Sequence, residues 1–205
     1  MTGHRLSPRA PATFHVDRSV GAGSHRLEAV FPGLDRLPEL ARLPLPSRAR
    51  GALVRTTRAE VVRGPVWMYV APHEVPEILR RAGVSPRTAP DDRIVIGASH
   101  LRRSARMVLM MDVLHELCHV IQRRAGRDLW QEGYRYADRP TEIEAYRVVL
   151  DLARAHGASD RFLQEYLRVD WLTPKEYRLL LRNVGVPPPS RASRRRSARP
   201  DAERP

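Results

Sequence analysis

The segment His115-Glu116-Leu117-Cys118-His119 has the residue types and the spacing of a metal site. On a helix, residues four positions apart lie on one face, about one turn apart. Two imidazoles at this spacing can therefore both reach one Zn²⁺ ion at roughly 2.0–2.1 Å. Glu116 lies beside the pair, where its carboxylate can accept a proton from a water that the metal has made acidic. The pattern predicts a hydrolytic zinc centre.

Zinc needs a third protein ligand, and the next histidine, His156, is too far along the chain to complete a three-histidine motif. Glu142 and Glu144 follow His119 by 23 and 25 residues. They lie about 200° apart around a helix, so only one of them can face the metal. In a Glu-x-Glu-Ala pattern the first glutamate is usually the ligand, which favours Glu142 and leaves Glu144 as the alternative. Weaker candidates lie on the preceding loop, namely Glu132 and Asp138.

Four helices are predicted around and after this motif. Residues from about Ala105 to Arg124 are apolar on most sides, which is typical of a helix buried in a core, and Gly126 ends them. The next helix, Thr141–Ala155, carries both glutamates. Two further helices are predicted at Asp160–Val169 and Thr173–Val184, the second with a good N-cap and proline pair.

The residues before the motif predict a small sheet of about three strands. Ala52–Val62 and Val66–Val70 are rich in β-branched and aromatic residues and predict a hairpin. Arg93–Gly97 predicts a third strand, which Ser99–Leu101 would prolong. A helix is expected at Pro72–Ala82. Strands followed by helices indicate an α+β fold with a short mixed or antiparallel sheet.

Three regions are expected along the chain. Residues 1–50 predict a poorly ordered or loosely packed N-terminal arm, with at most a short helix around Leu34–Leu43. Residues 51–186 would form the domain that carries the metal site. Residues 187–205, with six arginines and several prolines, predict a disordered tail.

Composition narrows the class of protein. The chain has 205 residues, a net charge of +13 and a single cysteine, Cys118, which excludes an intramolecular disulfide and a zinc site built from cysteines. Since no apolar run is long enough for a membrane span, we expect no membrane partner and a cytoplasmic location. The basic flanks allow weak, non-specific binding to nucleic acid, although a solvated, disordered tail is the favoured interpretation.

The motif HELCH, a short connection and then TEIEAY together resemble the gluzincins, which are zinc peptidases with a helical HExxH and a glutamate from a following helix. The short spacing is closest to compact members such as the minigluzincins and the ImmA/IrrE-type peptidases. The resemblance implies a zincin-like fold, with His115, His119 and Glu142 as ligands of Zn²⁺ and Glu116 as the general base. The segment RIVIGASHL, residues 93–101, resembles the edge strand above the cleft in such enzymes.

Tyr146 lies four residues after Glu142, on the same helix face, so it would lie by the metal. It would hydrogen-bond a ligand or the oxyanion, or pack as an aromatic residue. The expected activity is hydrolysis of a protein or peptide substrate. The alternative is a regulatory module that cleaves one partner, such as a repressor, or nothing, and is associated with nucleic acid through its flanks.

Overall fold

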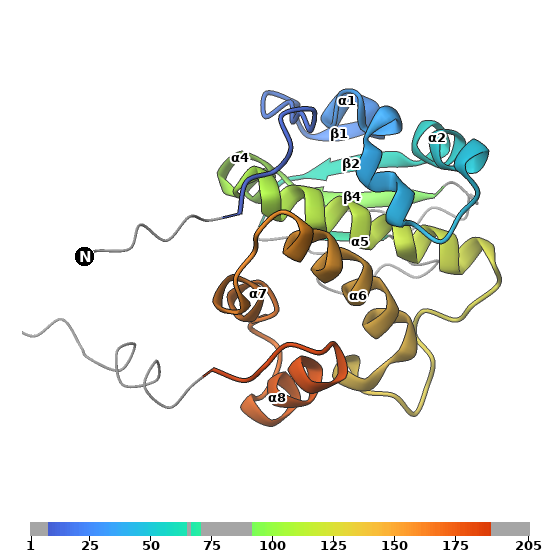
Figure 1. Cartoon of the computed structure of the whole chain (residues 1–205). Coiled ribbons are helices and arrows are strands. Elements are labelled where there is room, and N and C mark those ends of the chain that lie inside the picture. Colours follow the sequence, from blue (N-terminus) through green and yellow to red (C-terminus); the bar gives the residue numbers. More distant parts are fainter. Residues whose placement is uncertain (1–7, 65–66, 71–91, 190–205) are drawn as a thin grey trace, which may run out of the picture.

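The computed structural model describes residues 8–64, 67–70 and 92–189. Four short strands, seven α-helices and three 3-10 helices make up this part of the chain (Figure 1). Their order is β1 (Gly23–Arg26), α1 (Leu27–Val30), η1 (Leu34–Arg36), η2 (Pro38–Arg42), α2 (Ser47–Thr56), β2 (Arg58–Val62), β3 (Met68–Val70), β4 (Arg93–Gly97), α4 (Ala98–Arg103), α5 (Arg106–Arg124), η3 (Tyr136–Asp138), α6 (Pro140–Ala155), α7 (Asp160–Tyr166) and α8 (Pro174–Asn183). This mixture confirms the α+β fold class.

The sheet is mixed, with strand order β1-β2-β4-β3. β1 pairs antiparallel with β2, β2 runs parallel to β4, and β3 pairs antiparallel with β4. The predicted hairpin is therefore wrong, because β4 lies between β2 and β3. The first half of the predicted strand Ala52–Val62 is also wrong, since it belongs to α2. Leu53, Val54 and Thr57 are buried there at helical spacing.

β4 is one of the two interior strands of the sheet, with β2, and is buried along its whole length. The predicted strand Arg93–Gly97 is confirmed, but its prolongation through Ser99–Leu101 is wrong, because α4 begins at Ala98. Among the described strands, β3 rather than residues 93–101 forms the edge of the sheet next to β4. The expectation of an edge strand in RIVIGASHL is thus corrected. The predicted helix Pro72–Ala82 lies outside the described residues.

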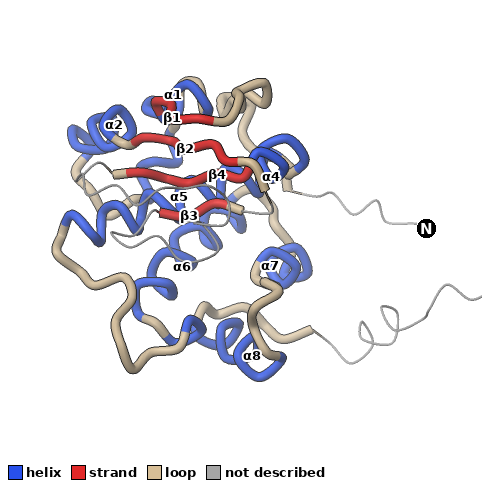
Figure 2. The backbone as a smooth tube through the Cα atoms, turned by 180° about the vertical axis from the view of Figure 1, so that it is seen from behind, coloured by secondary structure: helices blue, strands red, loops and turns tan. Residues whose placement is uncertain are grey.

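α5 packs against one face of the sheet, and α6 packs against α5 on the side away from it (Figures 1 and 2). Because α5 lies between these two layers, it is buried on nearly all sides, as the sequence predicts. The three following helices confirm the predicted ones within a few residues. α8 begins with a capping box, in which Thr173 and Glu176 satisfy each other's backbone N–H groups.

Residues 8–50 are part of the fold, in contrast to the expected loosely packed arm. β1 joins the sheet, and the rings of Phe14 and Phe31 stack in the core with centroids 5.7 Å apart. The Arg18 guanidinium donates hydrogen bonds to the Leu101 and Ser104 carbonyls at 2.8 and 2.7 Å. The predicted helix around Leu34–Leu43 is two 3-10 helices. Irregular backbone buries these apolar residues, so they show neither helical nor strand periodicity.

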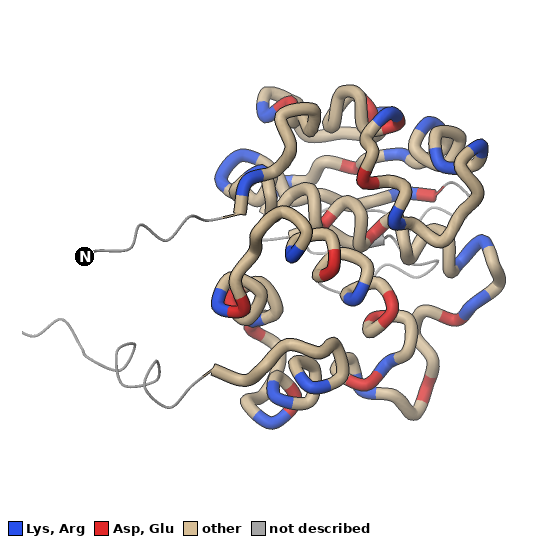
Figure 3. Tube along the Cα trace, viewed as in Figure 1, with Lys and Arg blue, Asp and Glu red and all other residues tan. Residues whose placement is uncertain are grey.

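Basic residues are spread over α2, α4, α8 and the end of α5 (Figure 3). Most of the arginine-rich tail, residues 190–205, lies outside the described residues. None of the helices within the described part of the chain is long and apolar enough to cross a membrane.

Candidate metal centre

α5 brings the two motif histidines together on one face. The Nε2 atoms of His115 and His119 lie 3.0 Å apart, and their rings are nearly perpendicular, at 85°. Both histidines are buried, and each is 6% exposed. The i, i+4 spacing therefore produces the convergent pair of nitrogen atoms that it predicts.

The first turn of α6 supplies the third group. Glu142 Oε2 lies 3.4 Å from His115 Nε2 and 3.5 Å from His119 Nε2. Two ligand atoms bound to one tetrahedral zinc at 2.0–2.1 Å would be about 3.3–3.4 Å apart. His115, His119 and Glu142 are thus a buried group that could hold a metal ion, as the sequence predicts.

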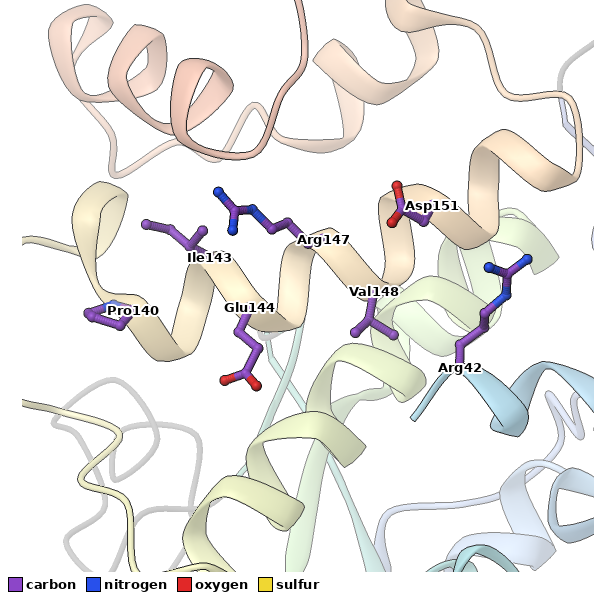
Figure 4. A pocket seen from close by; sticks show the side chains of 7 residues that line it. All are labelled: Arg42, Pro140, Ile143, Glu144, Arg147, Val148 and Asp151. Carbon is purple, nitrogen blue, oxygen red and sulfur yellow. The ribbon is translucent and has the colours of Figure 1, made fainter. Parts of the chain in front are cut away.

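The other carboxylates considered from the sequence lie elsewhere. Glu144 accepts a hydrogen bond from Gln122 Nε2 at 2.9 Å and pairs with Arg127. It lines a surface pocket along α6, seen in Figure 4. Asp138 pairs with Arg135 at 2.8 Å, and Glu132 is exposed. Within the described residues, none of the three joins the His-His-Glu group.

Gln122 fixes the tautomer of His119. Its Nε2 faces two acceptors, the Thr141 carbonyl at 3.0 Å and the Glu144 carboxylate. The amide oxygen must therefore face His119 Nδ1, at 2.8 Å, and accept its proton. In its neutral form, with the Nδ1 proton held by Gln122, His119 therefore presents the lone pair of Nε2 towards His115 and Glu142. Three lone-pair donors converging on one point suit a bound cation, which is the chemistry that a zinc site requires.

The same crowding shifts the pKa values of the three groups. Burial lowers the pKa of His115. Burial alone would also lower the pKa of His119, but its contacts with Glu142 outweigh burial and raise that pKa to about 9. Hydrogen bonds from both histidines overcome the effect of burial on Glu142 and hold its pKa well below its usual range. Glu142 is therefore a carboxylate at neutral pH, as a metal ligand must be.

Glu116 and Tyr146 both lie by this group, as the sequence predicts. Glu116 is buried, and its negative charge helps to raise the pKa of His119. The Tyr146 ring lies 4.5 Å from the His115 ring, and its hydroxyl lies 2.6 Å from that of Tyr136. Burial and the charge of Glu142 raise the pKa of Tyr146, so its hydroxyl keeps its proton.

Cys118 has no place in the group. Burial raises the pKa of its thiol to about 12, and the side chain packs in the core. Cys118 directly precedes His119 and lies about 100° from it around the helix, which turns the thiol away from the Nε2 atoms.

Four polar residues around the site receive no role from the sequence, namely Arg139, Asp112, Gln122 and His100. Arg139 lies 3.7 Å from the second oxygen of Glu142, and Asp112 accepts hydrogen bonds from His100 and Tyr166. The sequence could have indicated Gln122 as a partner of His119, because it lies three residues later on the same helix face. Nothing in the sequence indicates His100, since only the tertiary fold brings it from α4 to Asp112 on α5.

No family model, curated protein or solved structure matches this chain. The geometry of the site therefore carries most of the evidence for what this chain does.

Proposed function

We propose that the chain is a zinc-dependent metallopeptidase of the gluzincin type. The convergence of His115, His119 and Glu142 within 3.0–3.5 Å of one another supports this proposal more than any other observation. Two imidazoles and one carboxylate form a donor set that suits zinc, and they leave a fourth position for water or substrate. The resemblance of the motif to the gluzincins supports the same assignment.

Bound zinc would supply Lewis acidity and make a water nucleophilic near neutral pH. His115, His119 and Glu142 would hold it, and Gln122 would keep His119 in the binding tautomer. Glu116 would accept a proton from the attacking water and deliver it to the departing amine nitrogen. Tyr146, a neutral donor beside His115, would hydrogen-bond the substrate oxygen that becomes negative.

The substrate would be an extended peptide. β3 lies at the edge of the described sheet and packs against α5, the helix that carries the histidines. An edge strand offers backbone N–H and C=O groups that can pair with a peptide. We assign this role to Met68–Val70 rather than to residues 93–101, which resemble an edge strand in sequence, because β4 is paired on both sides.

Glu116→Gln tests the mechanism. We expect the variant to bind near one zinc per chain, as the wild type does, and to lose hydrolysis of a mixed peptide pool by roughly 10²–10⁴-fold. Glu132→Gln is the matched control, because Glu132 is exposed and outside the group; it should keep both properties. Hydrolysis retained by Glu116→Gln would contradict the general-base role. If zinc binds but the wild type cleaves no peptide, the peptidase proposal is wrong.

A further inference from the structure

A closed ring of side-chain contacts begins and ends beside His115. On its first side, Tyr146 lies against His115, and its ring is 6.3 Å from that of Tyr136. Tyr136 in turn lies 5.9 Å from Trp171, and Trp171 lies 6.3 Å from Trp67. Aromatic contacts thus lead without a break from the candidate metal centre to two tryptophans.

The second side returns to the same tryptophan. The Tyr146 ring lies 6.3 Å from that of Tyr166, whose hydroxyl donates to Asp112 Oδ1 at 3.0 Å. The other oxygen of Asp112 accepts from His100 Nε2 at 2.7 Å, and the His100 ring stacks on Trp67 at 5.8 Å. We call the full set the rim: His115, Tyr146, Tyr136, Trp171, Trp67, His100, Asp112 and Tyr166.

The exposed fraction of the side chains in the rim rises from the metal-binding group towards the two tryptophans. His115 and Tyr146 are each 6% exposed, whereas Trp67 is 40% and Trp171 48% exposed. Two large indoles left in water, in contact with each other and inclined at 73°, form an apolar corner on the surface. Their link to His115 distinguishes them from scattered surface aromatics.

Trp67 also lies on the proposed path of the peptide. It directly precedes β3, and its carbonyl accepts a hydrogen bond from the Gly97 N–H at 2.8 Å. Its backbone therefore continues the ladder between β3 and β4. A peptide that pairs with β3 would pass the corner that Trp67 and Trp171 form.

The chemistry of the corner favours an apolar occupant. His100 uses both ring nitrogens, one on Asp112 and one on the Ser104 hydroxyl at 2.9 Å. Asp112 uses both oxygens. Within the described residues, the polar groups next to Trp67 are therefore already paired, and the indoles offer surface for an apolar or aromatic side chain.

We propose that Trp67 and Trp171 form a subsite for an apolar, preferably aromatic, side chain of the peptide held at the His115–His119–Glu142 centre. The inference rests on the proposed function but concerns specificity. It predicts that one residue of the substrate, at a fixed distance from the metal-binding group, is selected for its ring.

Peptide hydroxamates test the subsite without catalysis, because the hydroxamate binds zinc directly. The probe is a tri-alanine hydroxamate, with each alanine replaced in turn by phenylalanine or by lysine. Calorimetry on the zinc-loaded full chain gives each Kd. We expect phenylalanine at one position to tighten binding at least about fivefold, the order expected for an added aromatic contact, and lysine at that position to give no gain.

Trp67→Ala and Trp171→Ala should each remove this gain while the tri-alanine hydroxamate still binds as in the wild type. Trp130→Ala is the matched control, since Trp130 is 51% exposed on another loop and lies outside the rim. It should keep the gain. No gain for phenylalanine at any position, a larger gain for lysine, or a gain that survives both variants would overturn the subsite. Failure of the tri-alanine hydroxamate to bind in a zinc-dependent way would overturn the metal centre, and the subsite with it. Loss of peptide hydrolysis alone would affect only the proposed function.

Discussion

The amide oxygen of Gln122 lies 2.8 Å from Nδ1 of His119, one turn earlier on α5. The amide nitrogen of the same side chain donates to the Thr141 carbonyl on α6 at 3.0 Å. One residue therefore orients a candidate metal ligand and also joins the two helices that carry the ligand group. Partners of this kind raise the basicity of a ligating histidine and hold its ring in place.

Gln122→Leu should weaken zinc binding by roughly 10–100-fold, because Nδ1 of His119 loses its acceptor and the ring its fixed tautomer. Competition with a chromophoric chelator measures the affinity. Gln131→Leu, a change on the exposed loop, is the control and should leave zinc affinity unchanged. Equal affinities in the wild type and Gln122→Leu would show that Gln122 does not support the ligand.

Glu142→Ala should abolish tight zinc binding, whereas Glu144→Ala should retain near one zinc per chain. The structural reason is that Glu142 faces both histidines, while Glu144 pairs with Gln122 and Arg127. Elemental analysis of the purified proteins gives the stoichiometry. The opposite result, with zinc lost only from Glu144→Ala, would move the third ligand to Glu144.

Zinc should stabilise the fold. A ligand that binds only the folded state adds about 4 kcal/mol at a thousandfold excess over its Kd, which is about 8–16 °C in Tm for a chain of this size. Calorimetric melts with zinc and with a chelator measure the shift. A double variant, His115→Ala with His119→Ala, is the control and should melt at the same temperature in both. A shift of similar size in that variant would place zinc elsewhere.

Tyr146→Phe should keep zinc and lower kcat by about 10²-fold, because the lost hydroxyl is the neutral donor beside His115. Tyr136→Phe removes only the partner of that hydroxyl and should reduce kcat less. Steady-state kinetics on a peptide substrate compare the two. An unchanged kcat in Tyr146→Phe would leave Tyr146 with a packing role alone.

Phe14→Ala should destabilise the protein by about 3–5 kcal/mol, the cost of emptying a large buried site. Phe14 is 1% exposed and stacks on Phe31. His15→Ala, at the exposed neighbouring position, should change the free energy of unfolding by less than about 0.5 kcal/mol. Urea denaturation measures both. A small effect for Phe14→Ala would mean that the N-terminal segment contributes little to the core.

Local periodicity made part of this structure predictable. The spacing of His115 and His119 defines a helix face, and the angle between Glu142 and Glu144 allows only one of them to face the metal. The order of the sheet was not predictable, because the pairing of β2 with β4 depends on contacts far apart in sequence. Residues 8–50 were misjudged for a related reason. Short 3-10 turns bury single leucines such as Leu34 and Leu40, and this leaves no repeating pattern to read.

His119 and Glu142 lie at the two ends of the segment that connects α5 to α6, and the contacts from Gln122 to Thr141 and from Arg127 to Glu144 close the same connection. A metal ion shared by these ends would act as a cross-link, comparable to a disulfide across a loop of 23 residues. Release of the ion and separation of the end of α5 from the start of α6 would then be one cooperative event. The chain between the helices would exchange its amide protons in step with metal loss, while the sheet beneath α5 stayed folded.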